Sequence, residues 1–216
     1  MYHFFVEPHQ IGAEEIRIEG ADVNHIRNVL RMKPGEEILI SSREGGDYFC
    51  RVEELEPEYV SAKILEEWEN KELPARIHLF QGLPKGDKME LIIQKAVELG
   101  AYRVVPVSMK RSVVKLDAKK ADAKRKRWNA VSESAAKQSK RSLIPEVAPL
   151  MTYKEAVKEA AGYDMVLLPY ESADGIRKTR ELLASVKPGT DIAVFIGPEG
   201  GFDPEYLRQY LLQYGR

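Results

Sequence analysis

The chain has 216 residues, of which 44% are hydrophobic and 31% charged; this is ordinary for a globular protein with one or two domains and a sizeable core. Its single cysteine, Cys50, excludes an internal disulfide and a cysteine-based metal site. The sequence has no apolar run long enough to span a membrane and no basic N-terminal flank of a signal peptide, so we expect a cytoplasmic protein.

The net charge of -1 conceals an asymmetry along the chain. Residues 1–75 carry 17 acidic and 8 basic side chains, whereas residues 76–216 carry 17 acidic and 25 basic ones. Within the second part, residues 110–141 hold 12 Lys and Arg residues against three acidic ones. Such a basic block is typical of a solvated helix face, and it is also the electrostatic footprint of a nucleic-acid site.

Residues 1–72 are typical of a small β domain. Five short strands are predicted over 2–6, 15–18, 37–41, 48–54 and 59–68, with turn signals at 33–35 and 44–47. A short helix is predicted over 21–29. Regularly spaced short strands favour a small barrel. The local basic cluster of Arg27, Arg31 and Lys33 fits a surface helix as well as an RNA contact.

After a polar linker at 69–74, strands and helices alternate. Strands are predicted over 77–81, 104–107, 143–147, 165–168 and 192–196. Helices are predicted from Asp87, with Glu90 in a box-like start, over 117–140, from a capping box of Thr152 and Glu155, over 175–186 and over 203–214. This alternation predicts a mostly parallel sheet with helices on both faces.

The strongest functional signal lies in residues 192–205. An apolar strand runs into Gly197-Pro198-Glu199-Gly200-Gly201, after which Asp203 and Pro204 begin a helix. Glycines let a ligand approach the main chain closely, and in open α/β sheets this junction binds ligands. Because Glu199 would repel phosphate, the loop suits a cationic ligand better. A tight turn between strand and helix is the alternative interpretation.

A second apolar strand ends in Leu168-Pro169-Tyr170-Glu171. If the two strands are neighbours, their loops form one crevice, which would suit an adenine-bearing ligand with a positive centre. The four histidines are scattered without metal-ligand spacing. The usual motifs of serine hydrolases, P-loop proteins and dinucleotide-binding enzymes are missing from the sequence.

Two Arg-Ser pairs stand in or beside the basic block, Arg111-Ser112 and Arg141-Ser142. A guanidinium beside a hydroxyl contacts phosphate well. Gln138 precedes Arg141 by three residues, which places the two on one face of a continuous helix. Each pair is equally typical of a solvated helix end.

Four motifs, in order over essentially the whole chain, resemble one family. They are 25–31 followed by Pro34-Gly35; 86–90 with 94–100; 127–139 with Arg141 and Ile144-Pro145; and 196–201. In these segments the chain is similar to the RsmE family, ribosomal RNA uridine-N3 methyltransferases of the SPOUT superfamily.

The resemblance implies an α/β fold class with two domains and a homodimer. Residues 1–72 would form a PUA-like β-barrel that binds RNA, and residues 75–216 a SPOUT methyltransferase domain with a parallel sheet and a trefoil knot. The family continues past the last predicted helix with a strand, a Leu-Gly-x-x-Ile-Leu-Arg-like loop and a final helix. This sequence ends at Arg216, so we expect the last knot segment to be absent from it.

The resemblance further implies a cofactor, S-adenosylmethionine, and a substrate, 16S ribosomal RNA in the small ribosomal subunit, methylated at N3 of the uridine at position 1498 during ribosome maturation. No metal and no membrane are implied. The implied cofactor-binding residues are Leu168, Pro169, Gly197, Pro198, Glu199, Gly200 and Gly201. The implied RNA-binding residues are Arg31, Arg111, Ser112, Gln138, Arg141 and Ser142.

The sequence does not identify the residue that removes the proton from uridine N3. Glu199 is the one candidate within the motif, and an arginine of the family's C-terminal segment is the alternative. Two other functions compete with methyl transfer. A non-catalytic RNA-binding or ribosome-assembly module would use the basic 110–141 helix, and a generic nucleotide-binding α/β enzyme would not depend on it.

Overall fold

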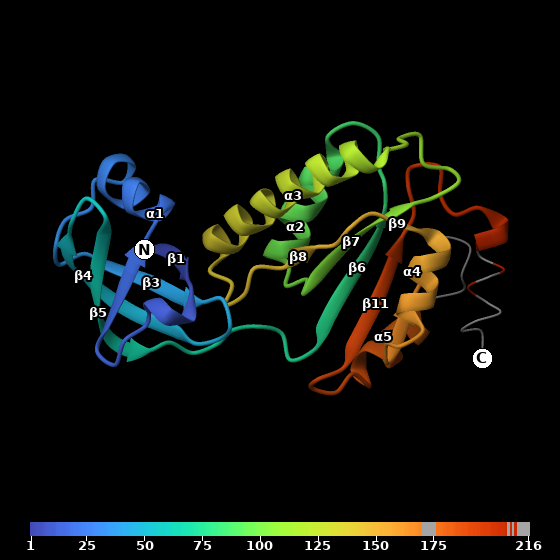
Figure 1. Ribbon diagram of the computed structural model, residues 1–216. Coiled ribbons are helices and arrows are strands. Elements are labelled where there is room, and N and C mark those ends of the chain that lie inside the picture. Colours follow the sequence, from blue (N-terminus) through green and yellow to red (C-terminus); the bar gives the residue numbers. More distant parts are fainter. Residues whose placement is uncertain (170–175, 207, 209, 211–216) are drawn as a thin grey trace. The chain divides into compact units, whose positions relative to one another are not determined.

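The computed structural model describes residues 1–169, 176–206, 208 and 210, with the backbone alone at 176–179 (Figure 1). Contacts divide the chain into two compact units: Met1–Glu72 with Ala136–Ile144, and Leu73–Ala135 with Pro145–Arg216. The contacts thus place residues 136–144 in the first unit. The predicted domain bounds of 1–72 and 75–216 stay a prediction.

The first unit is built on a five-stranded mixed sheet in the order β1-β3-β4-β5-β2. Its strands are β1 (Tyr2–Val6), β2 (Glu15–Glu19), β3 (Glu37–Ser42), β4 (Asp47–Leu55) and β5 (Tyr59–Glu67), which confirms all five predicted strands. β1 runs parallel to β3, and the other neighbours are antiparallel. Because β1 and β2 are edge strands of this sheet, the predicted barrel is a half-barrel.

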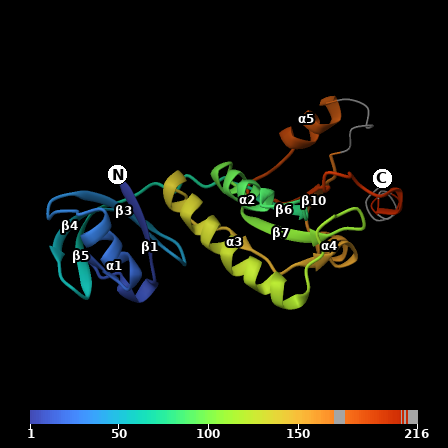
Figure 2. The ribbon, with the colours of Figure 1, turned by 90° about the horizontal axis from the view of Figure 1, so that it is seen from above.

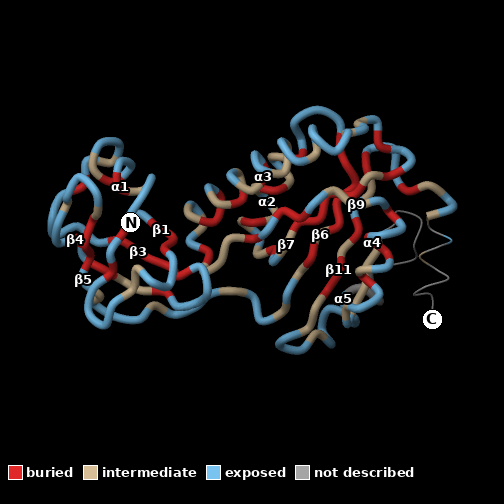
Figure 3. The backbone as a smooth tube through the Cα atoms, viewed as in Figure 1, coloured by how far each residue is buried: buried red, intermediate tan, exposed pale blue. Residues whose placement is uncertain are grey.

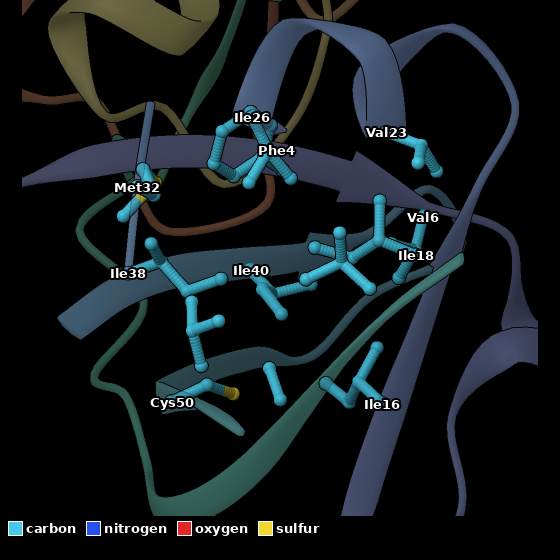
Figure 4. Packing of buried hydrophobic residues seen from close by; sticks show 13 residues of the cluster. Phe4, Val6, Ile16, Ile18, Val23, Ile26, Met32, Ile38, Ile40 and Cys50 are labelled. Carbon is cyan, nitrogen blue, oxygen red and sulfur yellow. The ribbon is translucent and has the colours of Figure 1, made fainter. Parts of the chain in front are cut away.

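The alternation of apolar and polar residues along these strands builds the core of the first unit. Ile16, Ile18, Ile38 and Ile40 point into it and are at most 1% exposed (Figure 4). The predicted helix over 21–29 closes this face as one α-helical turn, α1 (Ala21–Asn24), followed by a π-helical turn, η2 (His25–Val29). A short 3-10 helix, η1 (Pro8–Gln10), follows β1.

The second unit holds a parallel sheet in the order β10-β11-β6-β7-β8, with β9 also paired to β7. Its elements are β6 (Arg76–Gly82), α2 (Lys88–Glu98), β7 (Arg103–Ser108), α3 (Ala118–Ser139), β8 (Glu146–Val147), β9 (Met151–Thr152), α4 (Tyr153–Ala160), β10 (Met165–Leu167), α5 (Ile176–Ala184) and β11 (Asp191–Ile196). Figure 2 shows α2 and α5 on one side of this sheet and α4 on the other, as the alternation predicted. Helix α3 lies beside α2, to which the Arg127–Glu90 and Lys124–Asp87 ion pairs join it.

The core of the second unit lies between the central strands and α4. Figure 3 shows β6, β7 and β11 as largely buried. The rings of Phe80 and Phe195, on neighbouring strands, stack with centroids 4.6 Å apart, and Tyr153 packs edge-on against Phe195. The capping box predicted at Thr152 and Glu155 is confirmed.

Two local predictions in this unit were wrong. The strand predicted over 143–147 is only two residues long, because side chains of α3 take its hydrogen bonds: Ser132 Oγ donates to Pro145 O, and Asn129 Oδ1 accepts from Val147 N–H. Asp87 makes no side-chain cap for α2. Its carboxylate pairs with Lys124, and Glu90 pairs with Arg127, so both acidic groups bind basic side chains of α3.

The helix predicted over 203–214 begins as expected. Residues 204–206, 208 and 210 are helical, and Asp203 Oδ1 accepts the N–H of Glu205 at 3.1 Å. Residues 211–214 of that prediction lie outside the described part of the chain, as do Tyr170, Glu171 and Gly175.

A buried histidine makes the first unit sensitive to pH. His3 is 5% exposed, and its Nε2 lies 2.8 Å from Ser41 Oγ, which in turn donates to Asp47. Burial, followed by the positive charge of Lys137, lowers the pKa of His3 from 6.5 to about 4. The unfolded chain therefore binds a proton here at a higher pH than the folded chain does.

We predict that the free energy of unfolding falls as pH drops from about 6.5 towards 4, because His3 stays neutral only in the folded state. The contribution of this group is about 2 kcal/mol between pH 7 and pH 4.5. The free energy of unfolding, measured with denaturant at both pH values, should fall by about 2 kcal/mol less in His3→Gln than in the natural chain. An equal pH dependence in both proteins would refute this role of His3.

Candidate functional site

The Gly-rich loop 197–202 follows β11, which lies between β10 and β6 and is parallel to both. Pro169, two residues past β10, and residues 197–202 line an open pocket of about 400 Å³. The predicted crevice between the ends of two neighbouring strands is therefore confirmed.

The glycines of this loop are required by its shape. Gly201 has φ of +67°, a left-handed conformation that side chains rarely adopt, and its N–H donates to Pro198 O at 2.8 Å. A Cβ at Gly197 would lie 3.3 Å from the carbonyl carbon of Gly201 and 3.4 Å from the ring of Phe202. A side chain at Gly197 would therefore crowd the turn, whereas at Gly201 the backbone conformation itself disfavours one.

The end of β6 lies directly beneath the loop. A Cβ on Gly82 would stand 2.8 Å from both N and Cδ of Pro198, and 3.0 Å from Sδ of Met109. The strand predicted over 77–81 stopped one residue short of Gly82, so this contact was missed. The sequence feature that could have indicated this contact is the glycine at the end of an apolar strand. In the structure this strand pairs with β11, the strand before the Gly-rich loop.

We predict that Gly82→Ala destabilises the protein by about 1–3 kcal/mol, because the new methyl group forces Pro198 away from β6. Gly162→Ala is the matched control. Its Cβ meets only Glu159 O at 3.6 Å, an ordinary contact, and should change stability by less than about 0.5 kcal/mol. Equal unfolding midpoints for the two variants would contradict the proposed fit of Pro198 on Gly82.

Glu199 fixes the loop to the segment that begins α2. Its carboxylate accepts the backbone N–H of Lys85 at 3.0 Å and pairs with Lys88 Nζ at 3.1 Å. Hydrogen bonds from its own N–H and from Lys85, followed by the Lys88 ammonium, hold the pKa of Glu199 below its usual range. A carboxylate held in this way is a weak base, so these contacts favour a structural role for Glu199.

The loop after β7 approaches the Gly-rich loop from another direction. Arg111 Nη1 donates to Gly200 O at 3.0 Å, and Arg111 Nε lies 3.8 Å from Asp203 Oδ2. Lys110 Nζ lies 3.6 Å from the same carboxylate. The structure therefore brings the predicted RNA-binding residue Arg111 together with the predicted cofactor-binding residue Gly200.

Two other predicted RNA-binding residues are buried. Ser112 is 5% exposed, and its Oγ has no hydrogen-bond partner among the described atoms. Arg141 is 8% exposed, because α3 ends at Ser139 and Lys140, with φ of +56°, turns the chain inward. The expectation that Gln138 and Arg141 share one helix face was therefore wrong.

Arg141 serves the first unit instead. Its Nε lies 2.8 and 2.9 Å from the two carboxylate oxygens of Glu72, and the N–H of Ser142 also donates to Glu72, at 2.8 Å. This buried pair holds residues 136–144 against the end of the β domain. Gln138 and Arg31 are exposed.

The basic block 110–141 is largely neutralised by carboxylates, most of them from elsewhere in the chain and two, Asp117 and Asp122, from the block itself. Nine of its 12 Lys and Arg side chains form ion pairs: Lys110, Arg111, Lys120, Lys124, Arg125, Lys126, Arg127, Lys137 and Arg141. The exposed pairs of α3, such as Lys120–Asp117 and Lys126–Asp122, contribute little stability each, so their basic side chains stay available to a polyanion. The two interpretations of the block, solvated helix and nucleic-acid surface, are compatible.

In the part of the chain that the structure describes, no group of three or more His, Cys, Asp or Glu side chains is placed to hold a metal ion. No helix within this part has the length and apolar character needed to cross a membrane.

Comparison with known proteins gives one consistent family. The RNA methyltransferase domain family matches residues 71–211, and the RNA methyltransferase PUA domain family matches residues 18–65. The ribosomal RNA small subunit methyltransferase E of Bacillus subtilis is 37% identical over all of this chain and 87% of its own length.

Solved structures agree with these matches. The Neisseria gonorrhoeae ribosomal RNA small subunit methyltransferase E, bound to S-adenosyl methionine, matches with a TM-score of 0.78 and 29% identity over 99% of this chain and 86% of that one. A Legionella pneumophila protein in complex with the cofactor SAM matches with a TM-score of 0.81 and 27% identity over the same shares of the two chains. The chain therefore belongs to the RNA methyltransferase family that contains ribosomal RNA small subunit methyltransferase E, with an N-terminal PUA domain and a C-terminal α/β RNA methyltransferase domain.

Proposed function

We propose that this protein uses S-adenosylmethionine to methylate N3 of a uridine in 16S ribosomal RNA. The observation that carries the proposal is the open pocket at the end of β11, which is lined by the Gly-rich loop and Pro169. It lies where ligands bind in parallel α/β sheets, in a chain whose relatives are methyltransferases of the small ribosomal subunit.

The residues present fit this cofactor. Pro169 and Phe202 offer apolar walls, while Gly201, whose Cβ position has no atom within 4 Å, leaves the main chain open to close approach. Leu168 packs against the core of the second unit and would support Pro169 from beneath. When bound, S-adenosylmethionine would supply a methyl group carried on a sulfonium. The chain would bind and orient the cofactor and exclude water from the transfer.

Uridine N3 carries a proton that must leave before or during methyl transfer. Glu199 was the candidate base, but its carboxylate is held by Lys85 and Lys88 and its pKa is lowered. We therefore propose that Glu199 orients the loop and does not take the proton. The exposed basic side chains of α3 would bind the RNA backbone.

Calorimetric titration with S-adenosylmethionine tests the proposed site. We predict binding to the natural chain and its loss in Gly200→Val, because even a Cβ at position 200 would lie 3.3 Å from Cβ of Arg111 and displace the loop. After incubation of 16S ribosomal RNA with the protein and the cofactor, reverse transcription of the RNA should stop at one uridine, because a methyl group on N3 prevents base pairing. RNA binding without cofactor binding would favour the alternative function, a non-catalytic RNA-binding or ribosome-assembly module.

Two substitutions of Glu199 test whether this residue takes the N3 proton or only orients the loop. We predict that Glu199→Gln, which keeps one oxygen to accept the Lys85 N–H, lowers kcat by less than about tenfold, whereas Glu199→Ala also raises the Kd for S-adenosylmethionine. The measurement is kcat and cofactor Kd for both variants. A loss of kcat by about a thousandfold in Glu199→Gln, with cofactor Kd unchanged, would restore Glu199 as the base.

The remaining parts of the proposal concern assembly and place of action. We propose a homodimer that acts in the cytoplasm on the small ribosomal subunit. Leu182 and Leu183 on α5 are 45% and 50% exposed, and a second copy of the chain would cover such side chains.

A further inference from the structure

We propose that Arg111 is a positioning residue for the cofactor loop and not a ligand of RNA phosphate. This inference rests on the proposed function, because it assigns a role within that site. It replaces the role that the Arg-Ser pair suggested from sequence alone.

The first support is the close contact between the two loops. A Cβ built on Gly200 would lie 3.3 Å from Cβ and 3.5 Å from O of Arg111, so little space separates them. Arg111 Nη1 donates to Gly200 O at 3.0 Å. A guanidinium bonded to this carbonyl fixes the orientation of the peptide unit between Gly200 and Gly201, which lines the pocket.

The second support is the electrostatic surrounding of the guanidinium. Arg111 Nε lies 3.8 Å from Asp203 Oδ2, and the Asp203 side chain is only 14% exposed. Asp203 also caps the following helix through the Glu205 N–H, and its pKa is lowered by that bond first and by Lys110 and Arg111 after it. Arg111 thus joins the loop to the helix start, which leaves fewer of its five N–H groups for a phosphate.

The neighbouring residue strengthens the same connection. The backbone N–H of Lys110 donates to Tyr206 Oη at 2.9 Å, and Tyr206 stacks on Tyr153 with ring centroids 4.0 Å apart. Ser112, on the other side, is buried and closes a turn through its N–H to Met109 O. The segment 110–112 is therefore anchored on both sides of Arg111, which fixes the backbone of Arg111 beside Gly200.

The chemistry of arginine provides the decisive test. A phosphate contact requires mainly a positive charge, which lysine keeps, whereas bridging a carbonyl and a carboxylate requires the planar fork of arginine. We predict that Arg111→Ala and Arg111→Lys both raise the Kd for S-adenosylmethionine about tenfold, the loss typical of one charge-assisted hydrogen bond. The Kd for 16S ribosomal RNA should stay within about twofold in Arg111→Lys.

Lys115→Ala is the matched control. It removes one positive charge from an exposed residue of the same loop, between β7 and α3, and no ion pair of Lys115 is described in the structure. It should leave the cofactor Kd unchanged. If Arg111→Ala weakens RNA binding and flattens its salt dependence, while Arg111→Lys restores both and the cofactor Kd never moves, Arg111 is a phosphate ligand and the inference is wrong.

Hydrogen exchange, measured in the full chain without ligand, tests the positioning role of Arg111 independently of the proposed function. The Gly201 N–H is bonded to Pro198 O at 2.8 Å, and its exchange reports how firmly the loop is held. We expect exchange about tenfold faster in Arg111→Ala and Arg111→Lys than in Lys115→Ala. This difference should appear even if the natural chain fails to bind S-adenosylmethionine, in which case the proposed function falls and the positioning role stands. Unchanged exchange in the Arg111 variants would overturn the inference.

Discussion

The contact of Pro198 with Gly82 is the constraint on which the candidate site depends. The last residue of β6 must lack a side chain, because N and Cδ of Pro198 occupy the place of its Cβ at 2.8 Å. This close fit brings the Gly-rich loop down onto the end of the sheet. Two further attachments then become possible: Glu199 reaches the start of α2, and Gly200 reaches Arg111 in the loop after β7. The loop is thus held from β6, from α2 and from β7, which gives the pocket fixed walls.

The local structure of this chain was predictable where periodicity and turn chemistry determine it. The five strands of the β domain, β11 and the start of the helix after Asp203 were correctly located, because their apolar patterns and capping residues act over a few neighbours. The crevice beside Pro169 was predictable too, since parallel neighbouring strands end at one edge of a sheet.

The rest depends on contacts between residues far apart in sequence. Glu199 meets Lys85 and Lys88 from more than 110 positions away, so no local pattern indicates that its carboxylate is already occupied. Arg141 meets Glu72 across 69 positions and is buried as a result, although its Arg-Ser pair suggested a surface contact. The short β8 has the same origin, because Ser132 and Asn129 of α3 replace the missing hydrogen bonds. Fold class follows from local patterns, whereas the roles of charged residues follow from tertiary partners.

Charge balance would allow the proposed site to serve a cationic cofactor and a polyanionic substrate. A positive field strong enough to attract RNA would repel a sulfonium, and an acidic pocket would repel RNA. Around the Gly-rich loop, Glu199 is paired with Lys88, and Asp203 is paired with Lys110 and Arg111. Among the described residues, these pairs balance the charges beside the loop, while exposed cations of α3, whose ion pairs are weak in water, remain available for phosphate. The carboxylates beside the loop therefore act by neutralising and placing basic groups, which is why the structure favours Glu199 and Arg111 as residues that position the loop.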